Sequence, residues 1–132
     1  MPIRMLCAAL LLAAAASRPL VAHHSFAATF DASKAVRVTG KLAKVEWTNP
    51  HIYFYVDVTD DKGTVVRWAC ESGAPGALSR RGFKRSLLKL GDELIVDGYQ
   101  AKNGANLMDA RRVTLPDGQI LVGASAGDGG PQ

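Results

Sequence analysis

The chain has 132 residues, of which 48% are hydrophobic, 21% charged and 7% aromatic. This length allows one domain and excludes large multidomain enzymes, coiled coils and proteins with several membrane spans. There are 16 Lys and Arg residues against 12 Asp and Glu residues, a net charge of +4. Removing the N-terminal segment that carries Arg4 and Arg18 leaves 14 against 12, a net charge of +2. We therefore expect no nucleic-acid partner, because nucleic-acid-binding proteins usually carry a dense basic face.

Residues 1–22 have the pattern of a signal peptide. Residues 1–4 form a short basic region, and the apolar run 5–16 is shorter than the about 20 residues of a membrane span. Cleavage after Ala22 makes His23 the new N-terminus, and cleavage after Ala16 is the alternative. No second long apolar stretch follows. We expect a periplasmic or secreted protein, monomeric and without a transmembrane segment after cleavage.

The mature chain is predicted to form short strands separated by turns. Residues 51–59 alternate between apolar and polar side chains, which is typical of a half-buried strand. Gly40 predicts a bulge in the first strand, and Asn103-Gly104 predicts a hairpin turn. The expected strands cover residues 36–47, 51–59, 64–71, 93–100 and 107–115, followed by a short segment at 119–122.

One helix is predicted between the third and fourth strands. Ser72 can cap it, Pro75 fits its first turn, and Gly82 can close its end. This order predicts a mainly β fold, a small five-stranded OB-like barrel with one short helix between strands three and four. Other small barrels and sandwiches also have five strands and a helix, so they remain alternatives.

The barrel is expected to span residues 23–122. Residues 123–132 contain four glycines and no bulky side chain, which predicts a disordered tail.

Five stretches resemble a family of small exported bacterial proteins known as a domain of unknown function. They are HHSF (23–26), VEWTNPH (45–51), WACESG (68–73), LGDE (90–93) and GYQAKNG (98–104). The resemblance spans about residues 22–122 and implies export and a single small domain, with no established activity. Cys70 departs from the pattern, where an aliphatic residue is expected.

The three histidines suggest a possible copper site. Cleavage after Ala22 places the α-amine and ring of His23 beside the ring of His24, and His51 follows Pro50 at the start of a strand. An amine and two imidazoles suit copper, either as a brace that includes His24 or His51 or as a flexible chelating tail. The alternative is that His23 and His24 form a polar start and that His51 is a turn residue.

Aromatic residues predict a ligand-binding surface. Tyr53 and Tyr55 share the face opposite the aliphatic side chains of their strand, and Trp47 and Trp68 are expected on either side. OB-folds stack ligands on open aromatic faces, and a glycan or another envelope ligand suits an exported protein. Packing of the tyrosines under the helix or the N-terminal arm is the alternative.

A basic window on and after the helix predicts an anion-binding surface. It contains Arg80, Arg81, Lys84, Arg85 and Lys89 and no acidic residue. Anionic envelope polymers or lipid head groups are the expected partners, and a merely solvated face is the alternative.

Signals for catalysis are poor. The sequence has no Ser-His-Asp motif, glycine-rich phosphate loop or CxxC pair. Cys70 is the only cysteine after cleavage, so no internal disulfide is expected, and its place in a strand favours a core role. We therefore expect a non-enzymatic binding module of the envelope, with a copper-binding protein as the alternative.

Overall fold

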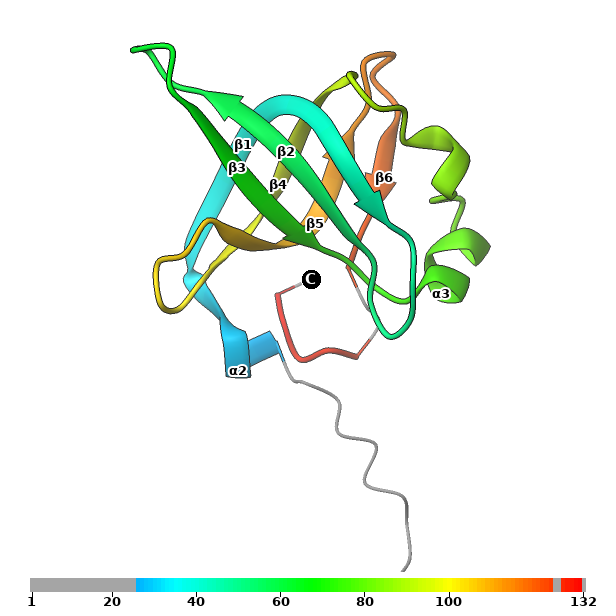
Figure 1. Ribbon diagram of the computed structural model, residues 1–132. Coiled ribbons are helices and arrows are strands. Elements are labelled where there is room, and N and C mark those ends of the chain that lie inside the picture. The colour runs from blue at the N-terminus through cyan, green and yellow to red at the C-terminus, as the bar shows by residue number, and fades with distance from the viewer. Residues whose placement is uncertain (1–25, 125–126, 132) are drawn as a thin grey trace, which may run out of the picture.

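The protein folds into a ring of strands, which a computed structural model describes over residues 26–124 and 127–131. The sheet order is β3-β2-β1-β4-β5-β6, and an additional pairing between β3 and β5 closes five strands into a ring (Figure 1). The fold is mainly β, as predicted, and the ring and its helix follow the order expected for an OB-like barrel. The sheet has six strands rather than five, because the predicted short segment at 119–122 pairs with β5. The strands are β1 (Phe30–Glu46), β2 (Tyr53–Thr59), β3 (Val65–Glu71), β4 (Glu93–Ala101), β5 (Leu107–Thr114) and β6 (Ile120–Val122).

The long strand β1 connects the two sides of the ring. Its first part pairs with β4, and from Lys41 onward it pairs with β2. Gly40 lies at this change of partner, where a Cβ atom would come 2.3 Å from the carbonyl oxygen of Asp57. The predicted bulge is not at Gly40 but at Ala43, the extra residue between two consecutive pairings with β2. Gly40 instead allows the backbones of β1 and β2 to approach closely.

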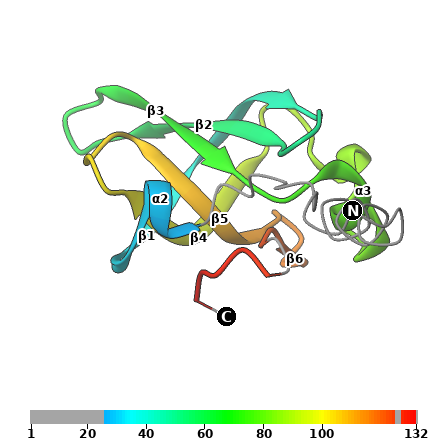
Figure 2. The same ribbon diagram turned by 90° about the horizontal axis from the view of Figure 1, so that it is seen from below.

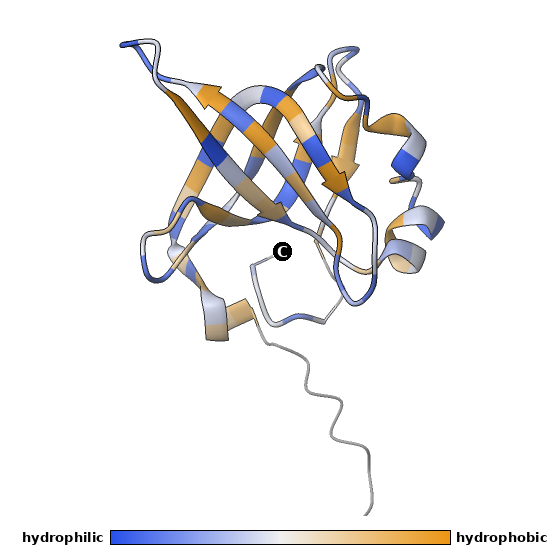
Figure 3. Ribbon diagram, in the orientation of Figure 1, coloured by the Kyte–Doolittle hydropathy of each residue, from blue (hydrophilic) through white to orange (hydrophobic). Residues whose placement is uncertain are grey.

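The core fills the interior of the ring. Alternate residues of β2 point inward, and Phe54 and Val56 are fully buried. The same alternation is visible as changing hydropathy along the strands (Figure 3). Cys70 is buried among them as a free thiol, and burial raises its pKa well above the usual range. Figure 2 shows β2 and β3 on one side of this core, with β4 and β5 on the other.

The helix between β3 and β4 is α3 (Pro75–Arg80), followed by the short 3-10 helix η1 (Arg85–Leu87). Pro75 begins the helix and Gly82, with φ of 89°, follows its end, both as predicted. The predicted cap is wrong: Ala74 occupies the N-cap position, without a side-chain hydrogen bond. Ser72 lies two residues before this N-cap position, and its N–H donates to the carbonyl of Ile52, which ties it to the loop before β2.

The two ends of the described chain meet below the ring. The short helix α2 (Phe26–Thr29) precedes β1, and the Phe26 N–H donates to the carbonyl of Asp128 at 2.9 Å. The sequence predicts a disordered tail over residues 123–132. In the part of this tail that the structure describes, Asp128 contacts Phe26 and Arg111. Glycines leave the chain free to follow the surface, and specific contacts then fix its course.

Residues 1–25, which contain the predicted signal peptide, lie outside the described residues. Within the described residues, no helix has the length and hydropathy needed to cross a membrane.

Candidate functional site

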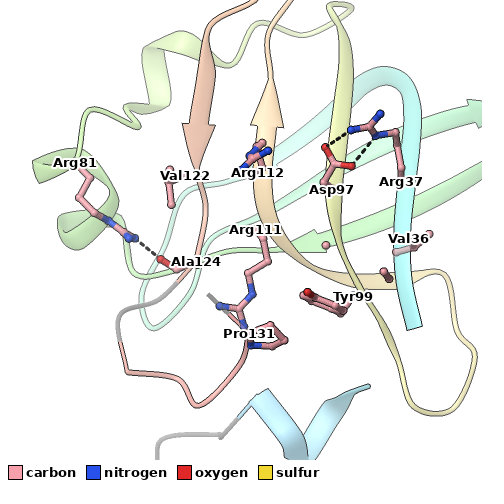
Figure 4. Close-up of a pocket in the computed structure, with 12 residues that line it drawn as sticks. Val36, Arg37, Arg81, Asp97, Tyr99, Arg111, Arg112, Val122, Ala124 and Pro131 are labelled. Carbon is pink, nitrogen blue, oxygen red and sulfur yellow. Dashed lines mark hydrogen bonds and ion pairs between the residues drawn. The ribbon is translucent and has the colours of Figure 1, made fainter. Parts of the chain in front are cut away.

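A pocket of about 620 Å³ lies on the outer face of β1, β4 and β5, beside β6 (Figure 4). Its volume is within the range of about 300–1,000 Å³ that is typical of small-molecule sites. Four arginines contribute to its lining, namely Arg37, Arg81, Arg111 and Arg112. Their origins on different elements show that the folded sheet, not a local motif, assembles the positive charge.

A β-bulge in β5 places two consecutive arginines on this face. Ala110 and Arg112 pair with consecutive residues of β4, so Arg111 is an extra residue in its strand. Successive side chains of a regular strand point to opposite faces, and a bulge interrupts that alternation. Ala110 and Val113 are consequently both buried, whereas Arg111 and Arg112 both line the pocket.

The arginines differ in how far their charge is neutralised. Arg37 forms a two-pronged ion pair with Asp97, with Nε 2.6 Å from Oδ1 and a terminal nitrogen 3.1 Å from Oδ2. Arg81 donates a hydrogen bond to the carbonyl of Ala124. Arg112 is exposed, and its side chain has no hydrogen-bond or ion-pair partner among residues 26–124 and 127–131. Arg112 is therefore the most available cation in the pocket.

Arg111 is mostly buried between two carboxylates. It forms an ion pair with Asp109, and a terminal nitrogen lies 3.1 Å from Oδ2 of Asp128. Its guanidinium also lies 4.9 Å from the ring centroid of Phe26, within the range of a cation–π contact. Burial raises the pKa of Asp109 to about 6; Arg111 opposes this rise, and the charges of Asp128 and Glu71 add to it.

An apolar wall completes the pocket. Its members include the side chains of Val36, Val122 and Pro131, with the ring of Tyr99 beside them. Tyr99 packs edge to face against Phe26, with ring centroids 5.6 Å apart. This contact fixes the orientation of the Tyr99 ring. The pocket therefore combines an available cation with apolar surface. This arrangement suits a small anion that carries an apolar body.

The predicted basic window reaches this pocket through one residue. Arg81 lines it, whereas Arg80, Lys84 and Arg85 are not part of the lining. Arg85 instead donates to the carbonyl of Leu88 at 3.0 Å, which closes the short turn that follows α3. Within the window, Arg81 alone belongs to the pocket lining, and an anion-binding role for Arg80, Lys84 and Arg85 stays a prediction.

The predicted tyrosine face exists on β2, but its hydroxyl groups are engaged. The hydroxyl of Tyr53 donates to Glu71 at 2.7 Å, and that of Tyr55 donates to Glu46 at 3.1 Å. Burial and the neighbouring carboxylates raise the pKa of both phenols. Lys44 also lies 5.3 Å from the ring centroid of Tyr55. The two rings are half-buried and form a small polar-rimmed surface.

The two tryptophans do not extend that surface. Trp68 pairs with the buried Val56 and packs partly against the core, so it lies on the opposite side of the strand from the tyrosines. Trp47 packs against Phe83, with ring centroids 5.8 Å apart. The four-residue aromatic platform is corrected to a pair of tyrosines, because strand register separates Trp68 from them.

Of the three histidines, the structure describes one. His23 and His24 lie outside it. His51 is described, and its Nδ1 lies 2.7 Å from Oε1 of Glu71. No group of three or more His, Cys, Asp or Glu residues suited to a metal ion occurs within residues 26–124 and 127–131.

The sequence contained one signal for the pocket that the pattern analysis missed. Arg111 and Arg112 stand together between the apolar residues Ala110 and Val113, a spacing that a regular alternating strand does not allow. An extra residue in the strand is the simplest way to bury both apolar neighbours. Arg37 offered no comparable signal, because its place beside Asp97 depends on the register between β1 and β4.

The fold and the pocket define a class, a small mainly β domain with an arginine-lined cavity on its outer sheet face. The chain belongs to the family of unknown function DUF6152, which it matches over residues 10–108. This match confirms the resemblance to a domain-of-unknown-function family. Arg111, Arg112 and Asp128 lie beyond the matched residues. None of the curated proteins matches the chain.

Proposed function

We propose that the protein is a non-enzymatic binding module of the bacterial cell envelope, and that it holds a small anionic ligand in the arginine-lined pocket. The observation that carries this proposal is the exposed Arg112 beside an apolar wall in a pocket of about 620 Å³. A guanidinium stays protonated at any physiological pH and presents a planar set of donors to a carboxylate or phosphate. Such a group binds charge and does not exchange protons with a substrate.

The proposed location rests on the sequence. The basic residues 1–4, the apolar run 5–16 and the small residue at Ala22 are the features of an export signal. A binding role is also consistent with the buried Cys70, since burial raises the pKa of its thiol and keeps it un-ionised.

The proposal is tested by titrating the mature protein with naphthalene-1-carboxylate and with the neutral naphthalene-1-carboxamide, using calorimetry. We expect the carboxylate to bind more tightly. Arg112→Gln should weaken its binding about tenfold, because a charge-assisted hydrogen bond contributes about 1.5–3 kcal/mol. Lys84→Gln is the matched control, since it removes an exposed cation that is not part of the pocket lining. Equal affinities for the two compounds, or equal effects of the two substitutions, would contradict the proposal.

Copper binding is the second candidate function, and one contact favours it. A histidine that binds metal usually donates its other ring nitrogen to a carboxylate, and His51 has that arrangement with Glu71. With Nδ1 engaged, Nε2 is the nitrogen left for a metal. The proposed partners are the α-amine and ring of His23, or the ring of His24, after cleavage at Ala22.

Calorimetry with Cu(II) and Zn(II) tests the copper hypothesis. We expect Cu(II) to bind more tightly than Zn(II), as nitrogen ligands require. One extra residue before His23 should abolish a brace, because the amine becomes an amide. His51→Ala should weaken a brace and leave a flexible chelating tail unaffected. Copper affinity that is unchanged by the blocked N-terminus would rule out the N-terminal site.

A further inference from the structure

The chain after β6 returns across the arginine-lined pocket, and two arginines of the pocket lining bind it. Arg81 holds the carbonyl of Ala124, and Arg111 holds the carboxylate of Asp128 (Figure 4 shows the first contact and the position of Arg111). Ala124 and Pro131 both line the pocket. The described parts of this C-terminal segment, residues 123–124 and 127–131, therefore form one wall of the proposed binding site.

The Asp128 carboxylate pairs with the Arg111 guanidinium in the way that the carboxylate of a ligand would. Its Oδ2 lies 3.1 Å from one terminal nitrogen of Arg111, and its Oδ1 lies 3.3 Å from the other. This fork-to-fork arrangement is the geometry that guanidinium groups use to recognise carboxylates. The two side chains are only 13% and 12% exposed, so the contact is sheltered from solvent screening.

Backbone contacts around Asp128 also hold the segment beside Arg111. Its carbonyl accepts the Phe26 N–H at 2.9 Å, and its Oδ1 accepts the Gly130 N–H at 2.8 Å. A Cβ atom on Gly130 would come 1.8 Å from a terminal nitrogen of Arg111. Glycine at this position therefore lets the segment lie close against Arg111, and any larger residue requires the segment or the end of the Arg111 side chain to shift. These contacts favour an aspartate at position 128 and a small residue at position 130.

The described part of the C-terminal segment lies outside the sheet. Residues 127–131 contact Arg111 and Phe26, and none of them belongs to a strand. Arg111 keeps its ion pair with Asp109 when Asp128 leaves. Release of the segment therefore does not leave Arg111 as a buried cation without an ion-pair partner. An external carboxylate can replace Asp128 without loss of charge balance.

We propose that Asp128 is a built-in competitor for Arg111, one of the pocket arginines, and that the ligand carries a carboxylate which displaces Asp128 from it. The inference rests on the proposed function and narrows its ligand from anions in general to carboxylates. Arg112 then provides the open cation that a ligand meets first, and Arg111 becomes available as the C-terminal segment moves aside. The segment regulates access to Arg111 by pairing it with the same chemical group that the ligand brings.

The test uses the full mature chain and three substitutions. Asp128→Asn removes the competing charge, and Gly130→Ala removes the space that the segment needs against Arg111. Asp117→Asn is the matched control, because Asp117 is an exposed turn residue whose carboxylate accepts only a local backbone N–H. Each protein is titrated with naphthalene-1-carboxylate and with naphthalene-1-sulfonate.

We expect Asp128→Asn to bind the carboxylate about tenfold more tightly than the wild type, a change equivalent to about 1.4 kcal/mol. Gly130→Ala should also bind it more tightly, whereas Asp117→Asn should match the wild type. A synthetic peptide of residues 124–132 should compete with the carboxylate on Asp128→Asn, and the same peptide with asparagine for aspartate should not.

Each contrary outcome overturns a different statement. Binding to the wild type that neither Asp128→Asn nor Gly130→Ala strengthens would overturn the competitor role and leave the anion pocket intact. An equal gain for the sulfonate would overturn the selectivity for carboxylates. Absence of binding to every variant would overturn the proposed function itself, and the inference with it.

Discussion

Arg111 and Arg112 are neighbours in sequence, yet their surroundings give them different roles. Arg111 is held by Asp109 and Asp128 and is mostly buried, whereas Arg112 is exposed on the same face. A buried cation must be paired, because desolvation of an isolated charge costs several kcal/mol. An exposed cation beside an apolar wall is free to bind a ligand. The bulge makes both environments possible within one strand.

Asp109 gives this cluster a predicted pH dependence. Its pKa is raised to about 6 in the folded protein, chiefly by burial, from the ordinary value of 3.8. Between about pH 4 and pH 6 the folded state therefore binds a proton that the unfolded state has released. The contribution of Asp109 to stability is largest at low pH and is lost as the pH rises through about 6, by up to about 3 kcal/mol.

Urea unfolding of the wild type and Asp109→Asn at several pH values between about 4 and 7 measures this contribution. We expect the free energy of unfolding of the wild type, relative to the variant, to fall as the pH rises. Asp117→Asn serves as the control and should keep the wild-type dependence. A difference between wild type and Asp109→Asn that stays constant over the range would show that Asp109 titrates at its ordinary pKa.

At the scale of the elements, β2 illustrates how alternation separates core from surface. Phe54 is fully buried and Tyr55 is half-buried on the opposite face. Phe54→Ala should destabilise the protein by about 3–5 kcal/mol, because it leaves a large cavity in the core. Tyr55→Ala should cost less, because the ring loses mainly its contacts with Glu46 and Lys44. Thermal unfolding compares the two, and equal losses would show that the tyrosine face is part of the core.

The elements were largely predictable because their signals are local. Strict alternation located β2, and Pro75 and Gly82 located the ends of α3. The predicted cap is wrong because the helix begins at Pro75, so that Ser72 lies two residues before the N-cap position, where its N–H pairs with Ile52, a residue distant in sequence. β1 begins at Phe30 rather than at residue 36, because Phe30 and Ala35 pair with Ala101 and Tyr99 of β4 on either side of an irregular stretch. Tertiary pairing overrides local preference at such positions.

At the scale of the whole molecule, the pocket depends on the pairing of strands that are distant in sequence, which local patterns do not predict. Arg37, Arg81 and Arg112 are far apart in sequence and come from β1, the end of α3 and β5. Their approach requires the pairing of β1 with β4 and of β4 with β5. The sequence indicated a basic window near α3, but the fold selects only Arg81 from it. The positive charge of the pocket therefore arises only when the fold brings these elements together.

The central claim is that the arginine-lined pocket, and not the tyrosine face, holds an anionic ligand. The most direct measurement follows the backbone amide signals of the mature protein by NMR during titration with naphthalene-1-carboxylate. We expect saturable shifts at Val36, Tyr99, Arg112 and Val122, which line the pocket, and none at Tyr53 and Tyr55. Shifts confined to the tyrosines, or no saturable shifts at the pocket, would contradict the claim.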